Sequence, residues 1–198
     1  QGCCGAIHYH TGHEQGAIEF AENNLKAFDR DDIDAIIVNV AGCGSMLKEY
    51  GHLWDDVSDG QTTDRTQFSS KVKDVHKFLD ELGFIAPKWN ISVKVTYHDA
   101  CHLVHAQKIS DPPRNLIRQI PGVELLELPE SEVCCGAAGT YNLVEPEMAD
   151  RLGERKLDCI RKTGANIVLT GNSGCLMQID RQRRLEQQSV IVMHPMDL

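Results

Sequence analysis

Two pairs of adjacent cysteines, each followed by a glycine, are the residues of this sequence best suited to chemistry. They occupy residues 3–5 in "QGCCGAIHYH" and residues 134–136 in "SEVCCGAAGT". Adjacent cysteines make poor disulfide partners, because the bridge would span a single peptide unit with strained geometry. Two neighbouring thiolates can instead bind one metal centre. The repeated pairs therefore indicate metal or redox chemistry.

The remaining cysteines complete one ligand set and leave another incomplete. In the second half of the chain, the candidate metal ligands and cofactor-binding residues are Cys101, Cys134, Cys135 and Cys175. Four thiolates can hold a tetrahedral zinc ion or an iron–sulfur cluster, and the lack of a C-x-x-C pair disfavours an ordinary zinc ribbon. In the first half, the candidates are Cys3, Cys4 and Cys43, whose fourth partner would lie before Gln1. No triad or carboxylate pair stands out, so we predict no catalytic residue.

Short apolar stretches precede these cysteines, and we expect them to be strands that position the thiols. Residues 35–40 and 167–170 each lead into a glycine-flanked cysteine and then a helical pattern, and the alternating stretch "SVKVTY" precedes Cys101. Strands that alternate with helices favour an α/β fold with parallel strands. The cysteines should then lie at the C-terminal ends of strands, where ligands bind and helix N-termini favour negative charge.

The two halves of the sequence repeat each other. The separation of Cys3 from Cys134 is nearly the same as that of Cys43 from Cys175, which is typical of a duplicated unit. We therefore expect two tandem, related α/β units with parallel strands.

The expected division places the C-terminal part of the first unit, with a linker, in residues 1–70 and the second unit in residues 71–198. The polar, turn-rich stretch 52–70 is the expected linker, and a helix is expected at 71–82. Apolar residues at helical spacing predict another helix at 144–163.

Composition and charge exclude several classes of function. The net charge of −9 argues against nucleic-acid binding, since phosphate contacts need clustered lysine and arginine. The basic stretch 180–188 alternates with acids and amides and is typical of a solvated helix face, with a patch for a partner or anionic lipid as the alternative. No apolar run approaches the roughly 20 residues of a membrane span, and no signal peptide is evident. The start at Gln1, inside a motif, indicates a fragment of a longer protein.

Several other possible ligands have simpler interpretations. Cys159 falls inside the helix expected at 144–163 and has no counterpart in the first half, so we expect a buried structural thiol. His8, His10 and His13 resemble a metal cluster, but a polar lining of the crevice is favoured.

Two histidines flank one of the predicted ligands. His98 and His102 lie on either side of Cys101. They either donate hydrogen bonds to cluster sulfur or are ordinary polar residues, and the sequence leaves both interpretations open.

The cysteine pattern resembles that of the cysteine-rich CCG domain, in which one cysteine is followed by C-C-G and then by a further cysteine. This family includes the cysteine-rich subunit of heterodisulfide reductase and the iron–sulfur subunits of glycolate and lactate oxidases. The stretches "YHDACHLVHAQKISDPPRNLI", "ESEVCCGAAGTYNL", "TGNSGCLMQI" and "HPMDL" are most similar to the C-terminal part of the glycolate oxidase iron–sulfur subunit. The resemblance covers essentially the whole chain.

The resemblance implies an electron-transfer role. Electrons removed from a 2-hydroxy acid by a flavin-containing oxidase subunit would pass through iron–sulfur centres toward a membrane acceptor such as a quinone. This chain would hold a 4Fe-4S cluster through the four cysteines of its second unit and carry electrons, leaving substrate chemistry to other subunits of the oxidoreductase complex. It would be cytoplasmic, with peripheral contact at the inner membrane as an option, and would have no nucleic-acid partner.

Alternatives from other classes stay open. Heterodisulfide-reductase-type domains carry a fifth cysteine, and Val40 and Asn172 stand at that position here, which puts their cluster type and disulfide-cleaving chemistry in doubt. A heterodisulfide or thiol–disulfide reductase remains one alternative, and a structural zinc-binding or metal-free interaction domain is another. Because a cluster handled in air is readily lost, the isolated protein could lack it.

Overall fold

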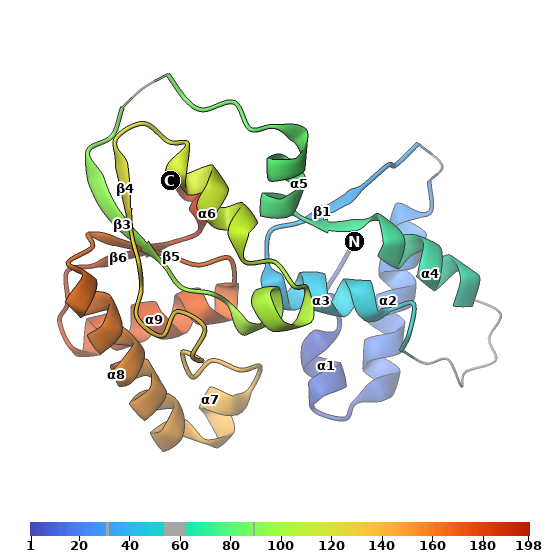
Figure 1. Ribbon diagram of the computed structural model, residues 1–198. Coiled ribbons are helices and arrows are strands. Elements are labelled where there is room, and N and C mark those ends of the chain that lie inside the picture. Colours follow the sequence, from blue (N-terminus) through green and yellow to red (C-terminus); the bar gives the residue numbers. More distant parts are fainter. Residues whose placement is uncertain (31, 54–61, 89) are drawn as a thin grey trace. The chain divides into compact units, whose positions relative to one another are not determined.

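The computed structural model divides the chain into two compact units, Gln1–Val75 and His76–Leu198. The structure describes residues 1–30, 32–53, 62–88 and 90–198. Each unit combines helices with parallel strands (Figure 1). The expected fold class, two α/β units with parallel strands, is therefore confirmed.

The first unit packs helices around a parallel pair of strands. Its elements in chain order are α1 (Ala6–His10), α2 (Glu14–Phe28), β1 (Ile36–Val38), α3 (Ala41–Glu49), α4 (Thr62–Lys71) and β2 (Val72–Asp74). Ile36 of β1 pairs in register with Val72 of β2. Tyr50 and Phe68 are buried in the core of this unit, and their stacked rings have centroids 5.5 Å apart. The apolar stretch at 35–40 thus forms the predicted strand.

The second unit is larger and alternates strands with helices. Its elements in chain order are α5 (Val75–Leu82), β3 (Val93–Tyr97), the π-helix η1 (His102–Ala106), α6 (Asp111–Arg118), β4 (Val123–Leu126), α7 (Tyr141–Val144), α8 (Pro146–Thr163), β5 (Ile167–Leu169), α9 (Ser173–Leu185), β6 (Ile191–Met193) and the 3-10 helix η2 (Pro195–Asp197). Helix α8 matches the helix expected at 144–163. It begins at Pro146, where a missing N–H costs nothing, and ends at Gly164 with φ of 69°.

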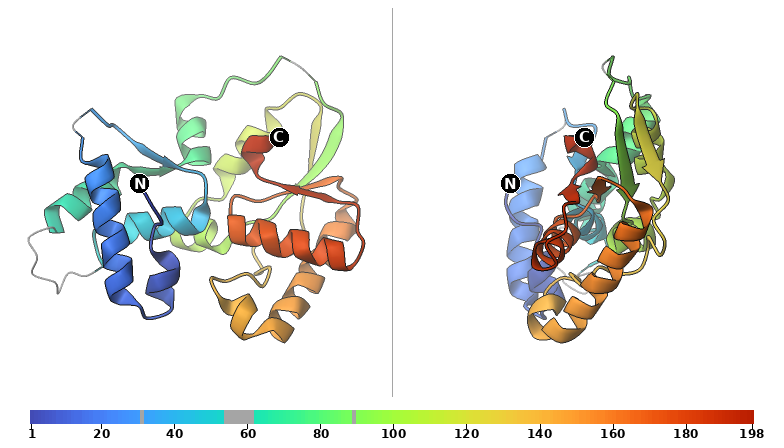
Figure 2. Two further views of the ribbon diagram at one scale, coloured as in Figure 1. Left: turned by 180° about the vertical axis from the view of Figure 1, so that it is seen from behind. Right: turned by 90° about the vertical axis from the view of Figure 1, so that its left-hand side faces the viewer.

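The four strands of this unit form one parallel sheet in the order β4-β3-β5-β6. All three residues of β5 are buried apolar side chains, as expected of a strand covered on both faces. Right-handed crossovers require α6 on one face of the sheet and α8 with α9 on the other. Helices α8 and α9 pack against each other, as the two views of Figure 2 show.

Connections from β3 and β5 leave the middle of this sheet in opposite directions. β3 leads to β4 at one edge, whereas β5 leads to β6 at the other. The crevice outside the carboxyl ends of β3 and β5 is therefore a topological switch point, the usual ligand position in open α/β sheets.

The predictions for the segment between the units need correction. Residues 54–61 of the expected linker lie outside the described part of the chain. The rest is not all irregular, since Thr62–Lys71 forms α4. The helix expected at 71–82 begins later, because Val72–Asp74 pairs with β1 as β2 and only Val75–Leu82 is helical. Residues 72–74 form a strand because they pair with β1, and the periodicity of the local sequence cannot indicate such a partner.

A buried ion pair ties α6 to the segment after β3. Arg114 donates from its two terminal nitrogens to the Asp99 carboxylate at 2.7 and 2.5 Å, and it also donates to the Ser110 carbonyl. The Asp99 side chain is 3% exposed and that of Arg114 is 23% exposed. Burial alone would raise the pKa of Asp99, but the Arg114 hydrogen bonds outweigh it and hold that pKa below its usual range.

We expect Arg114→Leu to destabilise the second unit by about 2 kcal/mol, because it removes the charged hydrogen-bond donors of a buried carboxylate. Urea denaturation, with hydrogen exchange to localise the loss, measures this. The matched control is Arg155→Leu, which breaks a pair with Glu130 whose side chains are 58% and 39% exposed, and which should cost less than about 1 kcal/mol. Equal effects of the two substitutions would contradict this assignment.

Candidate metal centre

Each of the four predicted ligands of the second unit follows the end of a strand at the switch point. Cys101 comes four residues after β3 and directly before the π-helix η1. Cys134 and Cys135 lie in the connection that follows β4, and Cys175 lies in the first turn of α9, after β5. The sheet topology therefore brings residues that are distant in sequence to one edge.

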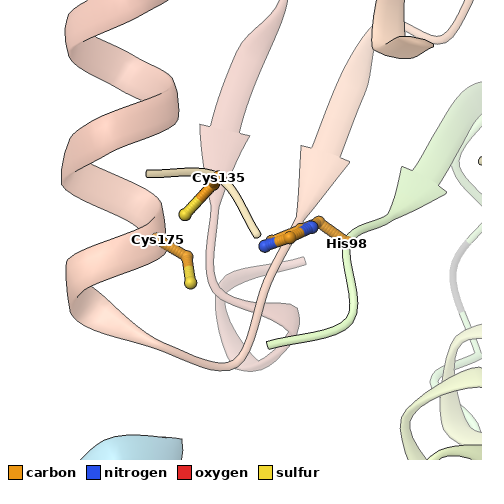
Figure 3. Close-up of side chains that lie close together, drawn as sticks. All are labelled: His98, Cys135 and Cys175. Carbon is orange, nitrogen blue, oxygen red and sulfur yellow. The ribbon is translucent and has the colours of Figure 1, made fainter. Parts of the chain in front are cut away.

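Cys135, Cys175 and His98 point toward one another (Figure 3). Their sulfur and nearest ring nitrogen atoms all lie within 4.8 Å of each other, and all three side chains are buried. Cys134 hydrogen-bonds to Cys135. The charges of Cys101 and Cys134 both act on Cys175. The structure thus places Cys135 and Cys175 in mutual reach, with Cys134 hydrogen-bonded to Cys135 and Cys101 near enough to influence Cys175.

Cys159 lies elsewhere in the unit. It is 6% exposed on α8, and its sulfur is 3.8 Å from a carboxylate oxygen of Glu130. The expectation of a buried structural thiol agrees with this position.

The glycine that ends the C-C-G triplet allows a tight turn beside the long helix that follows. Gly136 has φ of 93°, and its N–H donates to the Cys134 sulfur at 3.3 Å. A Cβ added at Gly136 would lie 2.4 Å from the carbonyl oxygen of Ala149 on α8. The turn therefore needs glycine for its positive φ and for the close backbone approach.

The first unit repeats the same turn. Gly5 has φ of 81°, its N–H donates to the Cys3 sulfur at 3.4 Å, and an added Cβ would lie 3.1 Å from the carbonyl oxygen of Ala17 on α2. The C-C-G triplet is thus a backbone motif that presents two thiols and packs against the fourth residue of a helix in both units.

Hydrogen bonds between neighbouring sulfurs shift the pKa values of the thiols in the second unit. The hydrogen bond to Cys135, together with burial, raises the pKa of Cys134. Cys134 acts to lower the pKa of Cys135, but the hydrogen bond to Cys175 and burial outweigh it and raise that pKa to about 12. The hydrogen bond from Cys135 lowers the pKa of Cys175. The thiols therefore resist ionising together unless a cation compensates them, and metal binding would release their protons.

Polar donors surround the thiol group. Asn172, at the position of the fifth cysteine in heterodisulfide-reductase-type domains, donates from its amide nitrogen to the Cys175 sulfur at 3.4 Å. Cys175 also lies in the first turn of α9, where the helix dipole favours negative charge. Such donors stabilise thiolate and more reduced metal centres.

The first unit brings its three cysteines together in the same way. The hydrogen bond from Cys4 lowers the pKa of Cys43 to about 7, while that bond and burial raise the pKa of Cys4. Cys3 acts on both of these thiols. The Tyr50 hydroxyl donates to the Cys4 carbonyl at 2.7 Å and fixes the turn.

The other histidines do not form such a group. His8 and His13 have ring centroids 5.3 Å apart. Among the described residues, however, the only group of three or more possible ligands in mutual reach is that of His98, Cys135 and Cys175. His102 lies near a thiol, with Nδ1 3.6 Å from the Cys101 sulfur.

One buried charged residue beside the site escaped the sequence interpretation. Lys156 on α8 is 1% exposed, and its amine donates to the carbonyl oxygens of Glu130 and Ser131. Its position, three residues after Gly153 and four before Ile160, places it on the buried face of the helix, and this spacing is the signal that could have revealed it.

The donor set of the second unit fits an iron–sulfur centre or a zinc ion. The Cys135 and Cys175 sulfurs face a buried ring nitrogen, Cys134 and Cys101 lie near enough to influence them, and ionisation of these thiols calls for positive charge. Cysteine thiolates and imidazole are ligands of both kinds of centre. No helix among the described residues is long and apolar enough to span a membrane.

Comparison with known proteins places both sites in a family. The family model described as "CCG: Cysteine-rich domain" matches residues 1–48 and 95–180. The matched segments contain both C-C-G triplets and all seven cysteines of the two groups.

Individual relatives show the same similarity. The chain is 40% identical over 90% of its length to the "Probable glycolate oxidase iron-sulfur subunit" of Bacillus subtilis, and 31% identical over 88% to the "Glycolate oxidase iron-sulfur subunit" of Escherichia coli. It is 32% identical over 98% to "Lactate utilization protein A" of Oceanobacillus iheyensis. The chain spans 40% and 43% of the two glycolate oxidase subunits and 79% of the third relative.

Proposed function

Because this chain belongs to the family of CCG cysteine-rich domains, we propose that it is an electron-transfer iron–sulfur module of a 2-hydroxy-acid oxidase complex. The proposal includes a 4Fe-4S cluster held by Cys101, Cys134, Cys135 and Cys175. Electrons would arrive from a flavin-containing oxidase subunit and leave toward a membrane acceptor.

The observation that carries this proposal is the close group of Cys135, Cys175 and His98 at the switch point of the second unit, with Cys134 and Cys101 near enough to shift the pKa values of these thiols. The names of the relatives supply the class of complex, because glycolate and lactate are both 2-hydroxy acids. A bound iron–sulfur cluster would supply reversible one-electron chemistry.

The residues of the chain would bind and tune this centre. The two adjacent cysteines would supply two thiolates from one turn, and Cys101 and Cys175 would supply one each from the other strand ends. Asn172 and the Gly136 N–H donate to sulfur atoms, and such donors raise the reduction potential by stabilising the added electron. The first unit, with Cys3, Cys4 and Cys43, would become a second site if a fourth ligand came from outside residues 1–198.

An electron-transfer experiment tests the role. Anaerobically prepared chain should lose its visible sulfide-to-iron absorption when mixed with reduced flavin mononucleotide and recover it when a soluble quinone is added. The chain alone should not oxidise glycolate or lactate. A centre that does not accept electrons from the flavin, or a chain that by itself reduces disulfides with those electrons, would overturn the proposal in favour of a structural or a disulfide-reducing role.

Asn172→Leu gives a second prediction, because it removes one donor to a cluster sulfur while keeping the side-chain volume. A net hydrogen bond of about 1 kcal/mol corresponds to a lowering of the one-electron midpoint potential by roughly 40 mV. Anaerobic redox titration measures it. In the control, Asn142→Leu, the lost amide faces Gln178 instead of a thiol, and the potential should stay unchanged. A raised potential in Asn172→Leu would contradict the role of this donor.

A further inference from the structure

One more side chain shares the crevice with the four cysteines. His98 directly follows the last residue of β3 and is 1% exposed. Its ring points toward Cys135 and Cys175 in Figure 3. Within the described residues, Nε2 of this buried ring has no hydrogen-bond partner, which is costly for a polar atom unless the site is built to receive a ligand.

The other ring nitrogen fixes the tautomer. Nδ1 of His98 lies 3.0 Å from the carbonyl oxygen of Ser131. A carbonyl oxygen can only accept, so Nδ1 must carry the proton in this hydrogen bond. The same oxygen accepts from the Asp99 N–H at 3.2 Å and from the Lys156 amine at 3.3 Å, so several donors hold it in place.

The ring is also held neutral. It is 1% exposed, and its hydrogen-bond partner is a neutral carbonyl oxygen rather than a carboxylate, so burial favours the uncharged form. A neutral imidazole with a proton on Nδ1 has a lone pair on Nε2. His98 therefore cannot donate a hydrogen bond from Nε2 to cluster sulfur, which was one of the two roles considered from the sequence.

We infer that His98 is a metal ligand of this centre, binding one iron through Nε2 as a fifth protein ligand in addition to the four cysteine sulfurs. The inference rests on the proposed function for the iron–sulfur centre itself. Metal-bound histidines commonly donate their other ring N–H to a backbone carbonyl, which orients the ring, and His98 has this arrangement with Ser131. As a neutral ligand, imidazole would add no negative charge to a centre that already holds four thiolates.

The measurement is pulsed EPR on the reduced, anaerobically prepared full chain, with and without histidine labelled with ¹⁵N in its imidazole ring. We expect a nitrogen hyperfine coupling of the size that a directly bound imidazole gives. Labelling should replace the ¹⁴N pattern of this coupling with a ¹⁵N pattern. The coupling should disappear in His98→Ala and in His98→Gln. It should persist in His102→Ala, the matched control, because that ring also lies near a cluster thiol.

The outcomes separate this inference from the function on which it rests. A wild-type centre with iron and labile sulfide but no imidazole coupling would overturn the inference alone, without requiring any variant to fold. A coupling that survives in His98→Gln or vanishes in His102→Ala would also overturn it. If wild-type chain assembled no iron and sulfide, both the proposed function and this inference would be wrong.

Discussion

Cys135→Ser is expected to abolish the visible sulfide-to-iron absorption of anaerobically prepared protein. Cys135 is at the centre of the sulfur group, since it hydrogen-bonds to both Cys134 and Cys175. Loss of a direct ligand should cost more than the roughly 10–100-fold in affinity that follows loss of a supporting hydrogen bond. Iron and labile sulfide per chain, measured with the absorption spectrum, should fall together. Cys134→Ser should behave in the same way.

Cys159→Ser is the matched control, because it makes the same atomic change at a buried thiol of the same unit. Its absorption should equal that of the wild type. All of these variants should be made in a Cys43→Ser background, so that the thiols of the first unit contribute no signal. A cluster that depends on Cys159, or that survives in Cys135→Ser, would refute the ligand assignment.

Gly136→Ala should strongly destabilise the second unit. The left-handed conformation costs an alanine about 1–2 kcal/mol, and a Cβ at 2.4 Å from the Ala149 carbonyl forces a backbone shift that costs about 1–3 kcal/mol more. We expect a loss of about 3 kcal/mol in urea denaturation of the metal-free chain, with increased hydrogen exchange confined to the second unit. The displaced turn should also prevent cluster assembly.

Gly139→Ala separates the cost of a positive φ from the cost of a steric clash with a neighbouring backbone. Gly139 also has a positive φ, of 63°, but an added Cβ would meet no atom within 4 Å. Only the conformational cost of about 1–2 kcal/mol applies, and the cluster should still form. Similar losses in Gly136→Ala and Gly139→Ala would show that contact with α8 does not hold the C-C-G turn.

Local pattern was sufficient to predict the strands that precede the cysteines. The apolar residues of β5 are buried on both sides, so the stretch 167–170 could form little else, and the alternating stretch before Cys101 became β3. The same holds for α8, whose proline and glycine mark its ends. Parallel strands place their carboxyl ends together, and this explains why ligand residues distant in sequence could be grouped in advance.

Features that depend on long-range partners could not be predicted from the sequence. β2 is a strand because β1 lies beside it, whereas its own residues, Val72–Asp74, continue a helical pattern. The state of His98 depends on the Ser131 carbonyl and on Lys156, which come from two other segments. Sequence neighbours of His98 contain no indication of its tautomer.

Metal and sulfide analysis of anaerobically purified chain tests the central claim most directly. Iron and acid-labile sulfide should be present together in the near-equal amounts of a 4Fe-4S cluster, and both should be lost in Cys135→Ser but kept in Cys159→Ser. Zinc bound without sulfide, released by the same substitution, would contradict the account and make the cysteine group of the second unit a structural zinc site.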